Sequence, residues 1–258
     1  MRSETVINFT NILDGYKSKY HGRKALEKYK RWFPLHLSGR LAGIVADLIC
    51  DGHLQPKPKL RLDYTSKSKS ELRRFGKEIY HVFKVKGKIR PCKTNKYSRS
   101  YNYGINCKPL ARVLIYIGVP TGAKVSKSFR VPRWIIRNEY YFKNFVQRVF
   151  DCEGTVWNNK YGWIGIEMWK EKKLMKDGIE FFNDIRKNLL KYYKIEATNV
   201  FIPNSKCNRK DGIKTVPLRF YVKKKSSIYK FYKNIGFNNS KKQFKLINLI
   251  NHGTETGQ

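Results

Sequence analysis

The sequence predicts an α+β protein built from two similar halves, each with the element order α-β-β-α-β-β-α. Two observations support this fold class. Short stretches recur at a nearly constant spacing, and apolar residues follow helical and strand periods in the same order in both halves. The length of 258 residues suits one large domain or two small ones, at roughly 100–200 residues each.

The repeat is clearest where a predicted helix ends. Asp51-Gly52 resembles Glu153-Gly154, at a spacing of 102 residues. The same spacing continues through the next predicted helix of each half, so the similarity extends well beyond one motif. Residue order and constant spacing together indicate an internal duplication.

Further along the chain the spacing grows to 118 residues. It then relates Tyr103 to Tyr221 and Gly118 to Gly236. An insertion in the second half explains the change, and the polar loop at residues 204–212 is the predicted place for it.

The first half is predicted to begin with a helix at residues 37–50. The following strand pair alternates charged and apolar residues from Lys59 to Tyr64, which is the period of a half-buried strand. Serines at residues 66–70 are N-cap residues for a helix that runs to Phe83. The half then continues with strands at residues 86–90 and 99–105 and a helix at residues 109–117.

The second half repeats this order, with a helix at residues 139–152, a strand at 218–223 and a helix at 228–235. The predicted organisation is a basic N-terminal extension (1–36), a first half (37–136, with a linker to about 138) and a second half (139–258). The extension is predicted to be partly helical and to dock through Trp32, Phe33 and Leu35. It would add phosphate contacts or cover the core, and a disordered lead is the alternative.

The charge excludes many functions. The 55 Lys+Arg residues outnumber 19 Asp+Glu, so the formal net charge is +36. Such a surface attracts polyanions, which makes nucleic acid the default partner and an anionic membrane the alternative. No apolar stretch approaches the roughly 20 residues of a membrane span, so no membrane partner is expected. Five cysteines without a C-x-x-C pair favour reduced thiols inside a cell.

Cations and aromatic residues gather on the predicted exposed faces of the strands. They recur at matching repeat positions in both halves, and such a face can follow phosphates and contact base edges. A solvated strand face without a ligand is the alternative. The residues predicted to contact DNA are Lys59, Arg61, Arg99, Tyr101, Tyr103, Arg219, Tyr221 and Lys223.

Two acids share a repeat position, Asp51 and Glu153, each at a helix end before glycine. The helix dipole makes this end a poor place for a carboxylate, and a bound divalent cation would offset the cost. Mg²⁺ takes one or two carboxylates together with phosphate oxygens and water. The predicted metal site comprises Asp51, Glu153, Gly52 and Cys152, although Cys152 is also interpreted as a small helix-packing residue. Turn or cap acids without chemistry are the alternative.

Both repeated stretches resemble a known family. Residues 44–52 (IVADLICDG) and 146–154 (VQRVFDCEG) resemble the two nine-residue motifs of single-chain LAGLIDADG homing endonucleases. The resemblance covers the chain from about residue 37 onward. It includes the stretches at residues 52–54 (GHL), 109–112 (PLAR), 118–120 (GVP), 131–135 (VPRWI) and 235–237 (IGF).

The resemblance implies a saddle with pseudo-twofold symmetry, in which the two motif helices pack together and both sheets lie in the major groove of double-stranded DNA. It implies that Asp51 and Glu153 bind Mg²⁺ or Mn²⁺, with Ca²⁺ as a non-catalytic substitute, and that one phosphodiester is hydrolysed on each strand. Lysines of the family's basic pocket correspond to Lys124 and Lys242, which would stabilise charge at the transition state. An ordinary phosphate contact or a solvated lysine is the alternative for each.

The resemblance further implies a monomer encoded within an intron or intein, in the cytoplasm of an archaeon or in an organelle. A non-catalytic nucleic-acid binder on the same scaffold, such as an intron-RNA maturase or a DNA-binding regulator, is the alternative function. Intron RNA is therefore a second candidate partner.

Two positions depart from the family pattern. Arg148 stands where a small packing residue is expected, and Asp47 stands where an apolar residue is usual. Asp47 is predicted to lie on the exposed side of its helix or to pair with Arg148. A third possibility is that it orients the metal-binding acids. His53 begins a strand, where a structural role competes with a role in the site or a DNA contact.

Overall fold

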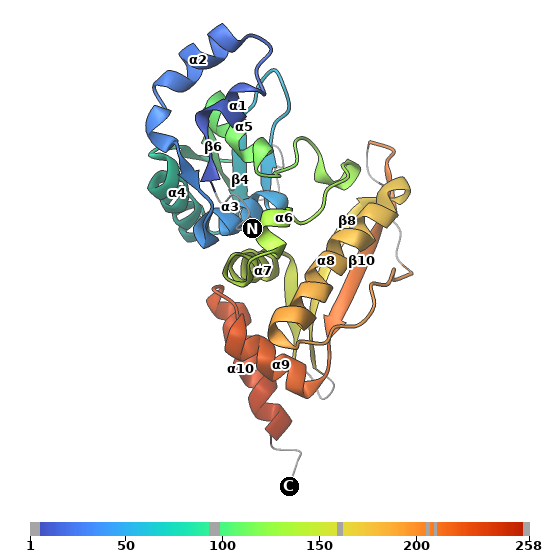
Figure 1. Cartoon of the computed structure of the whole chain (residues 1–258). Helices are drawn as coiled ribbons and strands as arrows, with labels where there is room; N and C mark the ends of the chain where they lie inside the picture. Colours follow the sequence, from blue (N-terminus) through green and yellow to red (C-terminus); the bar gives the residue numbers. More distant parts are fainter. Residues whose placement is uncertain (1–5, 93–98, 159–161, 205–206, 209–210, 255–258) are drawn as a thin grey trace. The chain divides into compact units, whose positions relative to one another are not determined.

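A computed structural model describes residues 6–92, 99–158, 162–204, 207–208 and 211–254. Contacts divide the chain into two units, Met1–Gly122 and Ala123–Gln258 (Figure 1). The segment that connects the two repeats therefore belongs to the second unit. The predicted insertion at residues 204–212 falls in part outside the described residues.

The first unit contains the predicted order α-β-β-α-β-β-α. Its first two long helices begin at serine caps, where the Ser38 and Ser68 hydroxyls accept the backbone N–H groups of Leu41 and Glu71. The elements are α3 (Gly39–Ile49), β3 (Gly52–Leu54), β4 (Leu62–Ser66), α4 (Lys69–Phe83), β5 (Lys88–Pro91), β6 (Tyr101–Ile105) and α5 (Lys108–Tyr116).

Strands β3, β4, β6 and β5 form, in that order, one antiparallel sheet. Helix α4 packs against β4 and β6. There the Tyr64 ring stacks on Phe75 with 4.5 Å between centroids, and Tyr103 meets Phe75 edge-on at 6.0 Å. Leu62 and Tyr64 are buried, as predicted, but Asp63 on the other face of the strand is buried as well.

The second unit repeats the same order. Its sheet has the strand order β7-β8-β10-β9, and α8 packs against β8 and β10, where Phe182 meets Phe220 edge-on at 5.2 Å. The elements are α7 (Glu139–Glu153), β7 (Gly154–Trp157), β8 (Trp163–Glu171), α8 (Met175–Tyr193), β9 (Cys207–Asn208), β10 (Lys214–Val222) and α9 (Lys225–Asn234).

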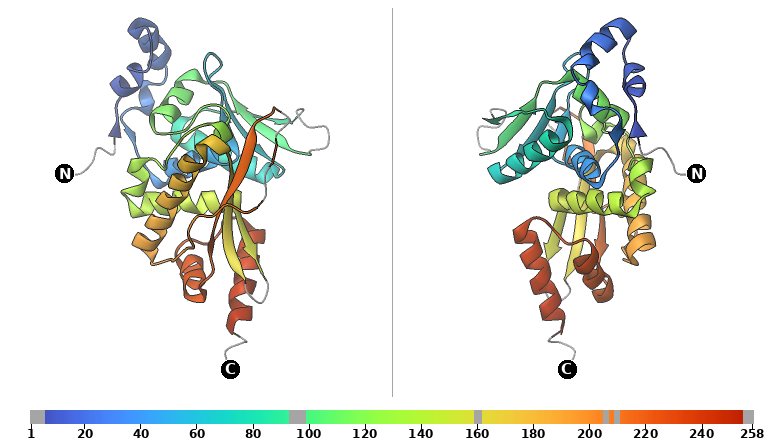
Figure 2. Two further views of the ribbon diagram at one scale, coloured as in Figure 1. Left: turned by 90° about the vertical axis from the view of Figure 1, so that its right-hand side faces the viewer. Right: turned by 60° about the vertical axis from the view of Figure 1, so that its left-hand side comes forward.

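The second unit also contains elements that the repeat does not predict. A long helix, α10 (Ser240–Thr254), follows α9 and runs alongside α9 and β7 (Figure 2). Short helices η2 (Lys124–Ser126) and α6 (Arg133–Ile136) lie in the connecting segment, and η3 (Lys172–Leu174) precedes α8.

The strand registers show that the spacing between equivalent residues of β6 and β10 is one residue shorter than predicted. The glycines that open β3 and β7 pair with Tyr64 and Ile166, and these residues pair in turn with Tyr103 and Phe220. Tyr103 therefore corresponds to Phe220 and not to Tyr221. Because neighbouring residues of a strand point to opposite faces, this shift moves Tyr103 and Tyr221 to different faces of their sheets.

The N-terminal extension belongs to the first unit and packs on the rest of it. Trp32 and Leu35 are buried, as predicted, and the Trp32 indole N–H donates to the Phe83 carbonyl oxygen at 2.6 Å. Its elements are β1 (Val6–Ile7), α1 (Phe9–Leu13), α2 (Lys19–Glu27), η1 (Lys30–Trp32) and β2 (Leu35–His36), and β1 pairs with β2.

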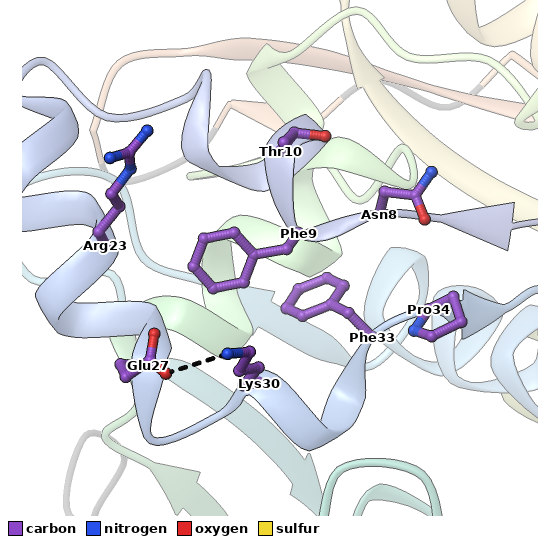
Figure 3. Close-up of a pocket in the computed structure, with 8 residues that line it drawn as sticks. All are labelled: Asn8, Phe9, Thr10, Arg23, Glu27, Lys30, Phe33 and Pro34. Atoms are coloured by element: carbon purple, nitrogen blue, oxygen red, sulfur yellow. Dashed lines mark ion pairs between the residues drawn. The ribbon is translucent and has the colours of Figure 1, made fainter.

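A pocket of about 510 Å³ lies within the extension (Figure 3). The rings of Phe9 and Phe33 meet edge-on in it, with 5.7 Å between centroids, and Lys30 pairs with Glu27 at 3.5 Å. Its lining contains none of the residues predicted for the active site. Among the described helices, none is long and apolar enough to cross a membrane.

Candidate active site and nucleic-acid interface

Each motif helix leads to an acid followed by a buried glycine. Asp51 is an exposed turn residue that follows Cys50, the C-cap of α3, and Glu153 is the half-buried last residue of α7. At both following glycines a Cβ would meet the backbone four residues earlier, 2.7 Å from the Leu48 Cα and 2.4 Å from the Phe150 carbonyl oxygen. Because only glycine allows the chain to turn so closely from helix into strand, the acid is held at the same place in both units. We call these helix-to-strand turns, Asp51-Gly52 and Glu153-Gly154, the corners.

Lys242, in the first turn of α10, caps the end of α7. Its Nζ lies 3.2 Å from the Phe150 carbonyl oxygen, 2.6 Å from that of Asp151 and 3.3 Å from that of Cys152. These carbonyls carry the negative end of the helix dipole, so an ammonium is stabilised there. Two further residues of the predicted metal site are Cys152, whose carbonyl oxygen accepts from Lys242, and Gly52, which opens β3.

A second contact joins α7 to the start of α10. The Asp151 carboxylate accepts the backbone N–H groups of Asn238 and Asn239 at 2.9 and 3.1 Å, and the Asn238 side-chain amide at 3.0 Å. Burial raises the pKa of Asp151, while these hydrogen bonds and Arg148 oppose the rise. Asp151 and Lys242 thus fix the helix end at which Glu153 lies.

The variant Lys242→Met is expected to lower the free energy of unfolding by about 1–2 kcal/mol, because the carbonyls at the end of α7 lose a cation. Urea unfolding measures the change. The matched control is Lys241→Met, which removes an exposed neighbour and should stay within about 0.5 kcal/mol of the parent chain. Equal losses in the two variants would contradict the capping role.

The other predicted basic-pocket residue, Lys124, is half-buried in η2. Its carbonyl oxygen and that of Lys127 accept hydrogen bonds from Lys170 Nζ, at 2.8 and 2.6 Å. Lys170 lies on the helix-facing side of β8, with 1% of its surface exposed. The sequence reasoning missed this lysine, although its place in the alternation after Ile166 and Met168 was a usable signal.

Burial lowers the pKa of Lys170 to about 8, with Asp177 raising it and Lys124 lowering it. Between about pH 8 and 10.5 the unfolded chain holds a proton that the folded chain has lost, so folding gains stability as the pH rises. Relative to Lys170→Met, the free energy of unfolding is expected to rise by on the order of 2 kcal/mol over this interval. Urea unfolding across the interval measures it, and a constant or falling difference would contradict the assignment.

Asp47 is fully buried, so the prediction of an exposed Asp47 is wrong. Its two carboxylate oxygens accept from Arg74 of α4, at 2.8 and 2.9 Å. Burial disfavours the Arg74 charge, but Asp47 outweighs this effect and raises the pKa of the guanidinium. The partner of Asp47 is therefore Arg74 in its own unit, whereas Arg148 lies 4.0 Å from Asp151.

The open face of the first sheet carries part of the set predicted to contact DNA. Arg61 lies there with its Nε 2.9 Å from Asp63 Oδ1, and His53 pairs across the strands with Asp63. Lys59 and Arg99 are exposed near this sheet. The register adds three residues that were not predicted and that share the face of Asp63: Lys88, Arg90 and Asn102.

Tyr103 and Tyr101 lie on the opposite, helix-covered side. Tyr103 is 7% exposed, and its hydroxyl accepts the Gly87 backbone N–H at 2.7 Å. The prediction of an exposed Tyr103 is therefore wrong, because the strand register places its ring in the core. Tyr101 shares this side by alternation, and its ring lies 4.5 Å from Lys69 Nζ at the start of α4.

The open face of the second sheet carries all three residues predicted there. Arg219 pairs with Glu167 on the neighbouring strand, and Lys223 Nζ lies 5.2 Å from the centroid of Tyr221. Within the described part of the chain, no three His, Cys, Asp or Glu side chains gather as a metal-binding group.

Solved structures of LAGLIDADG proteins share this architecture. Mesophilic variants of the homing endonuclease I-DmoI match 76% of this chain and 95% of theirs at 15% identity and a TM-score of 0.50. The homing endonuclease I-WcaI bound to its DNA recognition sequence matches 93% of this chain and 98% of its own, at 13% identity and a TM-score of 0.50. Full-length DUF199/WhiA from Thermatoga maritima matches 85% of this chain and 61% of its own, at 15% identity and a TM-score of 0.52. These likenesses show a LAGLIDADG-type fold.

Sequence similarity is more limited, and no family model matches the chain. The tRNA-splicing ligase RtcB of Pyrococcus abyssi is 30% identical over 105 residues, which are 39% of this chain, and that of Methanopyrus kandleri is 29% identical over 175 residues, which are 62%. The chain spans only 11% and 18% of the length of these two relatives.

Proposed function

We propose that the chain is a site-specific double-strand DNA endonuclease that hydrolyses one phosphodiester on each strand, with divalent metal held by Asp51 and Glu153. The strongest support is the repeated corner at the ends of α3 and α7. Each unit keeps an acid at this corner next to a glycine that tolerates no side chain. One acid for each unit suits a substrate in which each of two strands needs one cut.

The donor set suits Mg²⁺ or Mn²⁺. Each corner supplies one carboxylate, and one or two carboxylates leave coordination positions for phosphate oxygens and water, which is how Mg²⁺ is usually bound. When bound, the metal would polarise the phosphodiester and stabilise the leaving oxygen. Lys242 is proposed to act as a positioning residue, because its Nζ fixes the last turn of the helix that ends at Glu153.

The net charge of +36 supports a duplex as the substrate. Exposed and half-buried cations near the open faces of both sheets are proposed to contact phosphates, with Lys124 of the connecting segment as a further candidate. The set comprises Lys59, Arg61, Lys88, Arg90, Arg99, Arg219 and Lys223. Affinity for the duplex should then fall steeply with salt, since the slope follows the number of phosphates contacted.

A pool of duplex DNA with a randomised segment tests the proposal without knowledge of the target. With Mg²⁺, sequencing of the newly formed ends should recover related sequences cut on both strands. With Ca²⁺, the same sequences should be bound and left intact. Specific binding without breaks in both Mg²⁺ and Mn²⁺ would contradict the nuclease and leave a DNA-binding protein.

A further inference from the structure

The open face of the first sheet contains a buried acid, Asp63. Its exposed fraction is 7%, although it lies on a face that is proposed to meet DNA. An acid on such a face weakens the attraction of phosphates, so it opposes binding unless a neighbouring group compensates for it. The neighbours of Asp63 show which group its carboxylate holds in place.

Two side chains donate to the Asp63 carboxylate. Gln55 Nε2 lies 2.7 Å from Oδ2, and Arg61 Nε lies 2.9 Å from Oδ1. The backbone N–H of Gln55 also donates to the Arg61 carbonyl oxygen at 2.8 Å, so the three residues form one connected group. Because each carboxylate oxygen has a donor, the orientation of Asp63 is fixed, and Asp63 in turn fixes the Arg61 guanidinium.

A glycine leaves room for the guanidinium. Gly104 of β6 pairs with Asp63 across the strands. A Cβ at this glycine would lie 2.5 Å from Arg61 Nη2 and 3.3 Å from Arg61 Cζ. The guanidinium therefore lies close over the backbone of β6, in a place from which a side chain at position 104 would displace it.

The remaining donors of Arg61 suit a guanine. Asp63 uses only Nε, and among the residues that the structure describes neither Nη atom of Arg61 has a hydrogen-bond partner. The Arg61 side chain is 33% exposed. In the major groove guanine presents two acceptors side by side, O6 and N7, which the two Nη groups of one guanidinium match. Adenine presents an amino donor beside N7, which would face one of these N–H groups.

A phosphate contact is the alternative for Arg61. Its ion pair with Asp63 offsets part of the charge that would attract a phosphate, whereas hydrogen bonds to O6 and N7 depend on the direction of the donors. A guanidinium that is already held in one orientation also loses less rotamer freedom on binding. An exposed cation such as Arg90 of β5 suits a phosphate better.

The second sheet does not repeat this arrangement. The strand registers relate Arg61 to Trp163 and Asp63 to Gly165. These two residues provide neither a guanidinium nor an acid. A guanine contact of this kind therefore belongs to the part of a duplex that meets the first sheet.

We propose that Arg61 contacts the O6 and N7 atoms of one guanine in the major groove of bound duplex DNA, and that Asp63, held by Gln55, is its positioning residue. The inference rests on the duplex binding of the proposed function, and for Arg61 it replaces a phosphate contact by a base contact. It does not depend on cleavage, because neither Asp51 nor Glu153 takes part.

Selection by binding, in Ca²⁺, from duplexes with a randomised segment identifies the guanine. The parent chain should recover sites with a guanine at one position that Arg61→Met no longer selects. In a recovered site, adenine in place of this guanine should weaken binding of the parent chain by about 5- to 150-fold, the discrimination typical of a bidentate contact. Arg61→Met should bind the two duplexes within about twofold of each other.

A base analogue tests the same contact in the parent chain. 7-Deazaguanine keeps O6 and lacks N7, so at this position it should weaken binding of the parent chain by at least about threefold. The same analogue should change the affinity of Arg61→Met by less than about twofold. This measurement does not require a substitution in the buried part of the sheet.

Asp63→Asn tests the positioning role. The variant keeps the size of the side chain, but its amide group can no longer accept from Gln55 and Arg61 at both ends. The ratio of guanine to adenine affinity should fall to less than about a third of the parent value. Gln55→Leu should lower the ratio in the same direction. A purely structural role would weaken binding to both duplexes equally and leave this ratio unchanged.

Arg90→Met is the matched control, since loss of an exposed cation on the same sheet should weaken binding to both duplexes equally. A guanine preference that persists in Arg61→Met would overturn the proposal. An equal loss on all sequences, with a weaker dependence of affinity on salt, would also overturn it, because it marks a phosphate contact. An unchanged ratio in both Asp63→Asn and Gln55→Leu would remove Asp63 as the positioning residue.

The outcome for the nuclease is separate. Intact guanine preference without cleavage in Mg²⁺ would contradict only the nuclease. Cleavage of both strands by a parent chain that selects no guanine through Arg61 would contradict only the present inference.

Discussion

Replacing Asp51 by Asn, or Glu153 by Gln, is expected to reduce double-strand cleavage by more than about a hundredfold and to leave duplex binding within about twofold of the parent chain. Each substitution keeps the size of the side chain and removes the charge that would hold the metal. The loss of stabilisation at developing negative charge typically costs this much in rate. Cleavage of a target recovered from the randomised pool measures the first quantity, and anisotropy in Ca²⁺ measures the second.

The controls for these variants are isosteric changes of exposed acids outside the corners. Glu139→Gln lies at the opposite end of α7, and Asp14→Asn lies in the N-terminal extension. Both controls should cleave at the parent rate. Full cleavage by either corner variant would remove that acid from the proposed site, whereas lost binding in either one would point to a structural role.

The largest effect on stability is expected for Arg74→Met. Asp47 is fully buried and both of its oxygens accept from Arg74, so the variant leaves a buried carboxylate without its cation. Breaking a buried pair in this way costs about 3–5 kcal/mol. Urea unfolding should show the loss as a lower midpoint with an unchanged slope.

Two further variants separate the buried charge from other effects. Arg73→Met removes an exposed neighbour on the same helix and should stay within about 0.5 kcal/mol of the parent chain. The double variant Asp47→Leu with Arg74→Met replaces the pair by apolar groups and should recover much of the lost stability. A double variant no more stable than Arg74→Met alone would show that the unpaired charge is not the cause.

Local signals in the sequence predicted most helices and strands. The serines before α4 and the alternation through Leu62 and Tyr64 act over a few residues, so they can be seen in the sequence. Among the described residues of the first unit no helix corresponds to α10, and a repeat cannot predict an element without a copy.

The sequence predicted some parts of the candidate site and not others. The corner acids follow from the repeat, because helix and strand meet there in the same way twice. The strand faces depend on register. The extra residue that lengthens the spacing lies after the start of α9, which is one residue longer than α5, so applying the longer spacing to the strands exchanged the faces of Tyr103 and Tyr221. The partner of Asp47 lies 27 residues away on another helix, a distance over which periodicity carries no information.

Equivalent positions of the two sheets carry different residues, with Arg61 in the first sheet and Trp163 in the second. In a homodimer both sheets would have the same sequence. Here each sheet is encoded separately, and the two surfaces have diverged while their backbones kept one topology. A substitution in one sheet therefore changes one surface and leaves the other unchanged, so the two surfaces can acquire different chemistry independently.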